Sequence, residues 1–250
     1  MKSFLAAVAF LTILPTGNIV AYDASAVARA AGWFPVVGAL LGLISVAVAA
    51  VLQGHLPPGV VAVGLVILDA LLTGALHFDG LADTADGFGG GKDREDTLRI
   101  MRDHNIGSFG AMALVLIVAL KVTAYAALLG GANGMRALVL TPVLGRWSML
   151  PLAAALPYAR PSASVIDGMG KRSLIWGTVA IVVVWAAAWL LRFPSMDDLI
   201  AAAAVVAATA LFGMECRRKI GGITGDTLGA NLELSECAAL LAFLWMGHAR

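Results

Sequence analysis

The chain has 250 residues, of which 60% are hydrophobic and 13% are charged, and its mean hydropathy is +0.89. Soluble globular domains carry about twice this share of charged residues, so the composition excludes that class and indicates an integral membrane protein. The net charge of +1 excludes the broad basic surface that nucleic-acid binding requires. Because a chain of this length holds about six to eight spanning helices, we expect residues 1–250 to form a single integral membrane domain.

The first fifteen residues combine one lysine with an apolar run, as a signal peptide does. No clean small-x-small cleavage site follows, and the rest of the chain is itself multispanning, so we predict a retained interfacial or re-entrant segment. About seven transmembrane helices follow, predicted from apolar runs that glycine, proline or charged residues bound. These are Trp33–Gln53, Val60–Phe78, Gly107–Leu129, Met135–Pro157, Ser173–Leu191, Leu199–Met214 and Ala230–Met246. The predicted fold is an all-α, polytopic membrane helix bundle.

The connections between the predicted spans alternate in length and in charge. Short connectors such as Gly54–Gly59 and Gly130–Gly134 join neighbouring spans on one side of the membrane. The long polar loops are Asp79–Ile106, Tyr158–Arg172 and Glu215–Gly229, and most of the lysines and arginines lie there. The positive-inside rule therefore predicts that the long loops face the cytoplasm.

Three carboxylates directly follow the second predicted span. On a helix, Asp79, Asp83 and Asp86 stand at positions i, i+4 and i+7 and share one face. Like charges at this spacing repel, and such oxygen-rich clusters suit a hard cation such as Mg²⁺, with substrate phosphates completing the shell. The alternative is a solvated helix start whose acids favour the helix dipole. Gly80 and Gly87 favour metal or diphosphate binding, because a solvated face does not require the close backbone approach that glycine allows.

A basic segment follows in the same loop. Arg99, Arg102 and Asp103 share a helical face just before several glycines. Arginine forks match phosphate oxygens, so both arginines are candidate phosphate clamps, and the alternative is that they are positive-inside anchors. The preceding mixed-charge run, Lys92–Asp96, is typical of a solvated loop.

Ionisable residues also occur inside predicted spans, where each needs a partner. Arg146 is a candidate substrate-binding residue that would reach the cytosolic site, or it forms a structural ion pair. Lys121 and Asp69 are expected either to pair with each other or to lie near the membrane interface.

A second motif runs from Gly221 to Glu236 and reads as a glycine-rich loop that opens a helix. Backbone N–H groups at such a helix start can hold an anion. Glu233 and Glu236 enter an apolar helix, where a solvated-face explanation fails, so they are candidates to bind metal or to orient a hydroxyl. The candidate substrate-binding residues of this motif are Gly221, Gly222, Thr224 and Asn231.

The blocks Phe10–Pro15, His77–Gly87, Arg99–Gly110 and Gly221–Glu236 resemble the cobalamin synthase family, the adenosylcobinamide-GDP ribazoletransferases. The resemblance implies a multi-pass enzyme of the bacterial or archaeal plasma (inner) membrane. It would join adenosylcobinamide-GDP to alpha-ribazole or its 5'-phosphate, release GMP and require Mg²⁺. The Asp-Gly-x-x-Ala portion is also similar to the CDP-alcohol phosphotransferases, over part of the motif only.

The resemblance also implies roles for particular residues. The metal ligands would be Asp79, Asp83, Asp86 and Glu233. Phosphate oxygens would be bound by Arg99, Arg102 and Arg146. The candidates for the base are His77, Asp103, Asp226 and Glu236. The expected partners are the two substrates and the lipid bilayer, with no nucleic acid, and a homo-oligomer stays open.

The main alternative from another class is a cation- or proton-coupled transporter that uses the same carboxylates. It predicts acidic residues near the midplanes of several spans, whereas most acidic residues here lie at the ends assigned to the cytosol. A membrane scaffold is a third alternative, but it leaves the dense acidic face without an explanation.

Overall fold

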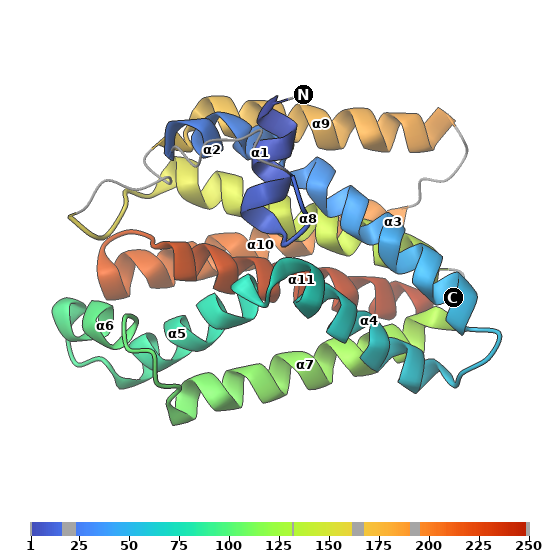
Figure 1. Ribbon diagram of the computed structural model, residues 1–250, viewed down its shortest axis with the longest axis horizontal. Helices are drawn as coiled ribbons and strands as arrows, with labels where there is room; N and C mark the ends of the chain where they lie inside the picture. The colour runs from blue at the N-terminus through green and yellow to red at the C-terminus, as the bar shows by residue number, and fades with distance from the viewer. Residues whose placement is uncertain (1, 17–23, 132, 162–167, 191–195, 249–250) are drawn as a thin grey trace.

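The computed structural model describes residues 2–16, 24–131, 133–161, 168–190 and 196–248. The regular elements in these ranges are helices, and the long ones run side by side along the long axis of the molecule (Figure 1). In chain order they are α1 (Lys2–Leu11), α2 (Ala24–Ala30), η2 (Ala31–Trp33), α3 (Phe34–Leu52), α4 (Pro58–Thr73), α5 (Leu76–Gly90), α6 (Arg94–Ile100), α7 (Ser108–Leu129), α8 (Gly134–Ala155), α9 (Lys171–Leu190), α10 (Met196–Ile220) and α11 (Gly225–His248). The predicted all-α polytopic bundle is confirmed.

Five segments within the described residues are long and apolar enough to cross a membrane, and the bent pair α4 and α5 makes a sixth when taken together. The five are Val27–Leu52, Ser108–Leu129, Gly134–Ala155, Met196–Ile220 and Gly225–Gly247. The predicted span Ser173–Leu191 corresponds to α9, although Leu191 lies outside the described residues. The predicted number of spans is therefore approximately right.

The predicted span Val60–Phe78 is wrong in one respect, because it is not a single helix. α4 ends at Thr73, and α5 leaves it at an angle of 91°. Gly74 and Ala75 both adopt left-handed backbone conformations, with φ of 60° and 56°, and such residues end a right-handed helix. Apolar composition continues through this turn, so hydropathy did not reveal it.

The N-terminal segment supports the break between α4 and α5. With ten residues, α1 is about 15 Å long, half the thickness of the hydrocarbon layer, and it lies across the bundle (Figure 1). This agrees with the prediction of an N-terminal segment that does not span the membrane. Just after α1, the Ile13 N–H donates to the Leu72 carbonyl at 2.8 Å, which satisfies a backbone acceptor near the end of α4.

Small residues bring α3 and α8 into close contact. A Cβ atom on Gly38 would lie 2.3 Å from the Pro142 carbonyl oxygen, and one on Gly42 would lie 2.7 Å from the Val139 Cα. Transmembrane helices associate through such small residues because lipid provides no hydrophobic driving force between helices.

The three long loops meet at one end of the bundle, as predicted. The Arg94 side chain, from the segment expected to be a solvated loop, donates to the Ile220 carbonyl at 2.8 Å and to the Ala159 carbonyl at 2.5 Å. Lys219 Nζ donates to the Phe88 carbonyl at 2.7 Å. Residues from all three loops are therefore in direct contact, and we call this the loop end of the molecule.

Substitutions at Gly74 and Ala75, in the turn between α4 and α5, are predicted to have opposite effects on stability. An L-residue in the left-handed conformation costs about 1–2 kcal/mol, so Ala75→Gly should stabilise the protein by about 0.5 kcal/mol after the chain-entropy loss of glycine. Gly74→Val should destabilise it, because a Cβ there would lie 2.9 Å from the Ile13 Cγ2 atom at φ of +60°. Thermal unfolding in detergent measures both effects. A loss of stability in Ala75→Gly would contradict the left-handed turn.

Candidate functional site

The acidic face predicted for residues 79–86 lies on α5, near the loop end. Asp79 is exposed, Asp83 is half-buried and Asp86 is buried. Asp83 lies within electrostatic reach of both other carboxylates. The face therefore forms as the spacing indicated, but its three members have different surroundings.

Asp86 is bonded to the start of α7. Its Oδ2 accepts from the Gly107 N–H at 2.7 Å, and its Oδ1 accepts from the Gly110 N–H at 2.9 Å. A Cβ on either glycine would lie 2.4 Å from this carboxylate. A carboxylate that binds free amides at a helix N-terminus stabilises that helix. Asp86 thus connects α5 to α7, and Asp79 and Asp83 are the acidic residues of this face with open surroundings.

The start of α11 adds a further carboxylate, Asp226. A Cβ on Gly80 would lie 2.7 Å from the Asp226 carbonyl oxygen, so α5 and α11 touch backbone to backbone at this point. Gly229 makes a similar approach one turn later, where its Cβ would lie 3.2 Å from the His77 Cα. Asp226 therefore lies within electrostatic reach of Asp83. The structure brings together the two motifs that the sequence showed separately.

Arg160 holds Asp226 in place. Its Nη2 lies 2.9 Å from the Asp226 Oδ2, and the Thr224 hydroxyl donates to the same oxygen at 3.2 Å. We call Asp79, Asp83, Asp226 and Arg160 the open acidic site. It has three carboxylates for one guanidinium, and this excess of negative charge favours a bound cation. Sequence reasoning assigned Arg160 only to the positive loops, and no motif indicated that it contacts Asp226.

The glycine loop before α11 is shaped for tight packing. Gly221 has a φ of 70°, and a Cβ on Gly222 would lie 2.2 Å from the Pro157 carbonyl oxygen. The Thr224 N–H donates to the Thr227 hydroxyl at 2.8 Å, and the Thr227 N–H donates to the Thr224 hydroxyl at 3.2 Å. This reciprocal pair is a capping box that starts α11. The Thr224 N–H, a predicted anion donor, is therefore engaged in the cap.

One of the two predicted phosphate clamps, Arg99, has a partner within its own segment. Arg99 pairs with Asp96 at 2.6 Å, and this hydrogen bond holds the pKa of the Asp96 carboxyl below its usual range. Asp103 accepts from the Asn105 N–H at 3.0 Å and from its side-chain amide at 2.8 Å, which likewise lowers the Asp103 pKa. Arg102 is exposed. These residues lie at the loop end, on α6 and the turn after it.

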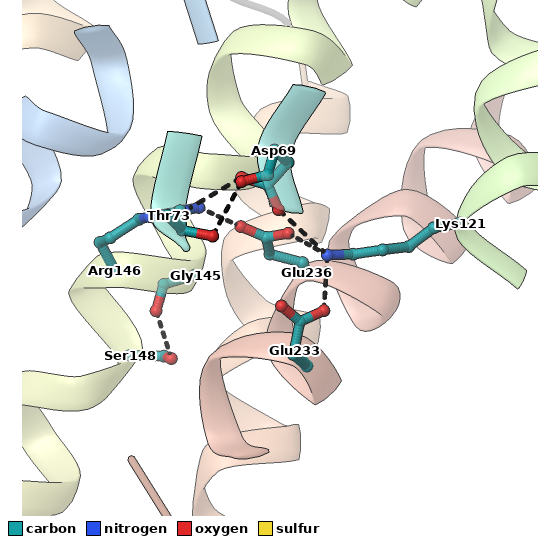
Figure 2. A network of polar contacts seen from close by, with 8 residues as sticks. All are labelled: Asp69, Thr73, Lys121, Gly145, Arg146, Ser148, Glu233 and Glu236. Carbon is teal, nitrogen blue, oxygen red and sulfur yellow. Dashed lines mark hydrogen bonds and ion pairs between the residues drawn. The ribbon is translucent and has the colours of Figure 1, made fainter. Parts of the chain in front are cut away.

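A second set of charged residues lies inside the bundle (Figure 2). Lys121 Nζ on α7 lies 2.6 Å from Glu233 Oε2 and 2.7 Å from Glu236 Oε2, both on α11. It also lies 3.8 Å from Asp69 Oδ2 on α4. Arg146 on α8 pairs with Glu236 and, at 3.2 Å, with Asp69 Oδ1. We call these five residues the buried ionic network.

Several predicted site residues are members of the buried ionic network. Glu233, Glu236 and Arg146 were candidates for metal, base and substrate, and the structure pairs them with one another and with Lys121. Of the two alternatives left open for Lys121 and Asp69, the structure shows the ion pair. One oxygen each from Asp69, Glu233 and Glu236 lies within 4.8 Å of the others, a spacing at which carboxylates can hold a metal. Lys121 and Arg146 supply positive charge at that point.

Two other candidates are buried in helix interfaces. His77 is 2% exposed, and neither ring nitrogen has a hydrogen-bond partner within the described residues. Asn231 is fully buried and donates from Nδ2 to the Ser148 carbonyl at 3.1 Å and to its hydroxyl at 2.9 Å. Of the four candidate bases, Asp226 and Asp103 lie at the loop end, whereas His77 and Glu236 are enclosed.

The network predicts a large effect from removing one charge. Lys121→Met leaves Glu233 and Glu236 without their shared ammonium, and breaking a buried ion pair costs about 3–5 kcal/mol. We therefore expect Lys121→Met to unfold at a much lower SDS fraction in mixed micelles. Arg218→Gln is the control, because it removes an exposed arginine that pairs with Glu215. If Lys121→Met and the wild type unfolded at the same SDS fraction, the buried ionic network would not contribute to the stability of the protein.

The sequence matches known proteins over nearly its whole length. The family model described as cobalamin-5-phosphate synthase covers residues 3–244. The adenosylcobinamide-GDP ribazoletransferase of Syntrophobacter fumaroxidans is 39% identical over 96% of each chain. The enzyme of the same name from Chlorobium phaeobacteroides is 37% identical over 94% of each chain. The one from Sinorhizobium medicae is 41% identical over 85% of this chain and 84% of the relative. No solved structure matches. The coverage and the identities confirm the resemblance seen in the motifs, and the chain belongs to the cobalamin-5-phosphate synthase family of enzymes.

Proposed function

We propose that the protein joins adenosylcobinamide-GDP to alpha-ribazole or its 5'-phosphate and releases GMP. The name that its relatives carry, adenosylcobinamide-GDP ribazoletransferase, supports this activity. The observation that carries the proposal is the open acidic site, where Asp79, Asp83 and Asp226 lie together at the loop end beside Arg160. A site of this composition suits a substrate that contains a diphosphate.

The reaction replaces a phosphoanhydride bond with a phosphate ester bond. A ribazole hydroxyl oxygen bonds to the phosphorus that carries the cobinamide. The bond from that phosphorus to the bridging oxygen breaks, and GMP leaves with that oxygen. The hydroxyl proton passes to a base. Such a transfer requires little covalent chemistry from the protein, so positioning and charge stabilisation do most of the catalysis.

The open acidic site fits Mg²⁺ by the chemistry of its donors. Asp79 is exposed and Asp83 and Asp226 are half-buried, so their carboxylate oxygens are accessible from the loop end. Hard divalent cations prefer such oxygens and keep positions for phosphate and water. When bound, Mg²⁺ would neutralise charge on the diphosphate. In this proposal Asp79 and Asp83 hold the metal, and Arg160 binds phosphate oxygen beside it.

Asp226 is the proposed proton acceptor. Among the candidate bases it is the one that belongs to the open acidic site. Within the described residues, Arg160 and Thr224 both bond to its Oδ2, which leaves Oδ1 for the hydroxyl proton. His77 and Glu236 are both 2% exposed, and a ribazole hydroxyl would not reach them without a rearrangement of the bundle.

The proposed orientation places the loop end in the cytoplasm of a bacterium or archaeon. Arg94 and Lys219 lie there, as do the basic residues of α6. The positive-inside rule supports a cytoplasmic position for loops with this charge. Both substrates would then reach the open acidic site from the cytosol.

Measurement of GMP release with and without Mg²⁺ tests the activity and the metal together. We expect Asp83→Asn to lower kcat about 100-fold and to weaken the dependence on Mg²⁺, because one charged oxygen ligand is lost. The matched control is Glu95→Gln, an exposed acidic residue on α6 at the same end of the molecule. Wild-type turnover and Mg²⁺ dependence in Asp83→Asn would refute the metal proposal.

The contact between α5 and α11 gives a separate prediction. Gly80→Ala adds a Cβ 2.7 Å from the Asp226 carbonyl oxygen, so Asp226 must move away from Asp79 and Asp83. We expect GMP release to fall about tenfold or more, since small displacements of reacting groups reduce rates steeply. Gly64→Ala on α4 is the control, because a Cβ there meets nothing within 4 Å. Equal activity in the two variants would contradict the proposed role of this contact.

A further inference from the structure

A groove of about 670 Å³ lies between the N-terminal helices and α9, away from the open acidic site. Its lining includes Arg29, Trp33, Val36, Arg172, Trp176 and Val183. α9 lies at the opposite edge of the bundle from α7 (Figure 1). In the packing order, α9 contacts α8, α8 contacts α11, and α11 contacts α5, so two helices separate the groove from the acidic face.

The two arginines of the groove, Arg29 and Arg172, lie at the same height along the axis of α9. Arg172 is the second residue of α9, and the neighbouring Ser173 hydroxyl donates to the Ala28 carbonyl, adjacent to Arg29, at 3.1 Å. One turn further, a Cβ on Gly32 would lie 2.9 Å from the Trp176 Cβ. The helices α2 and η2 therefore run beside the first turns of α9. Arg29 and Arg172 both lie at the end of the groove where α9 begins.

The rest of the groove is apolar. Val179 and Val183 extend its lining along α9, and Val36 faces them from α3. Val183 lies about 16 Å along the helix axis from Arg172. Trp33 and Trp176 are 42% and 59% exposed between the charged and the apolar parts. Exposed tryptophans at such a boundary are typical of the membrane interface.

We propose that this groove binds one anionic phospholipid. Arg29 and Arg172 would bind the phosphate, and an acyl chain would lie along Val36, Val179 and Val183. Basic pockets between membrane helices bind anionic head groups, and guanidinium forks match phosphate oxygens. The apolar length favours a lipid over free phosphate. Among the described residues that line the groove, both ionisable side chains are arginines, which favours an anionic lipid over a zwitterionic one.

Tryptophan quenching by brominated lipids tests the site in the reconstituted full-length protein. In phosphatidylcholine bilayers, brominated phosphatidylglycerol should quench the wild type more than brominated phosphatidylcholine at the same mole fraction. The Trp176→Phe variant should lose part of this excess quenching. Each of Arg29→Gln and Arg172→Gln should lower the preference about fivefold, and the double variant should remove it.

Two control variants distinguish a specific lipid site from a general attraction of anionic lipids to a charged protein surface. Arg218→Gln removes an exposed arginine elsewhere in the chain and should keep the preference for phosphatidylglycerol. Ala180→Phe fills the groove with both arginines in place and should lower the excess quenching, which keeps the test decisive if the arginine variants misfold. Equal quenching of the wild type by both lipids would overturn the proposal. An equal loss in Arg218→Gln, or an unchanged preference in Ala180→Phe, would also overturn it.

Discussion

The cost of placing Lys121 and Arg146 inside a bilayer is the constraint on which the bundle depends. Both side chains are almost completely buried, so each needs carboxylate partners from other helices. Those partners, Asp69, Glu233 and Glu236, come from α4 and α11, and the ion pairs thereby fix four helices in one arrangement (Figure 2). Glycines at these contacts allow the approach. A Cβ on Gly145, for example, would lie 2.6 Å from the Glu236 Cγ.

The same helix connects the network to the open acidic site. Asp226 precedes Glu233 by seven residues on α11, about two turns or 10 Å. Once the network has set the position of α11, its first turn meets α5 at Gly80, and Arg160 orients the Asp226 carboxylate. The left-handed turn between α4 and α5 directs the acidic face to this place.

Environment distinguishes the acidic residues of the open acidic site from those of the buried ionic network. Within the described residues, Asp79, Asp83 and Asp226 have one guanidinium beside them, that of Arg160, and accessible oxygens, which suits the binding of a metal and a diphosphate. The carboxylates of the network are enclosed with two cations, which suits a structural role. A transporter would need carboxylates inside spans, and the carboxylates of the buried ionic network are paired with Lys121 and Arg146, in a chain whose family is an enzyme family.

Sequence alone was enough to predict the helical membrane bundle, the acidic face of α5 and the family, because apolar length, helical spacing and short motifs are local properties. Which charges meet became visible only in the packed bundle. Glu233 was predicted to bind metal because a carboxylate that enters an apolar helix needs a partner, and its partner in the structure, Lys121, is 112 residues away in the chain. The sequence also did not reveal the contact of Arg160 with Asp226 or the break between α4 and α5 at Gly74. Electrostatic pairing and backbone turns depend on distances in three dimensions, which composition and spacing do not record.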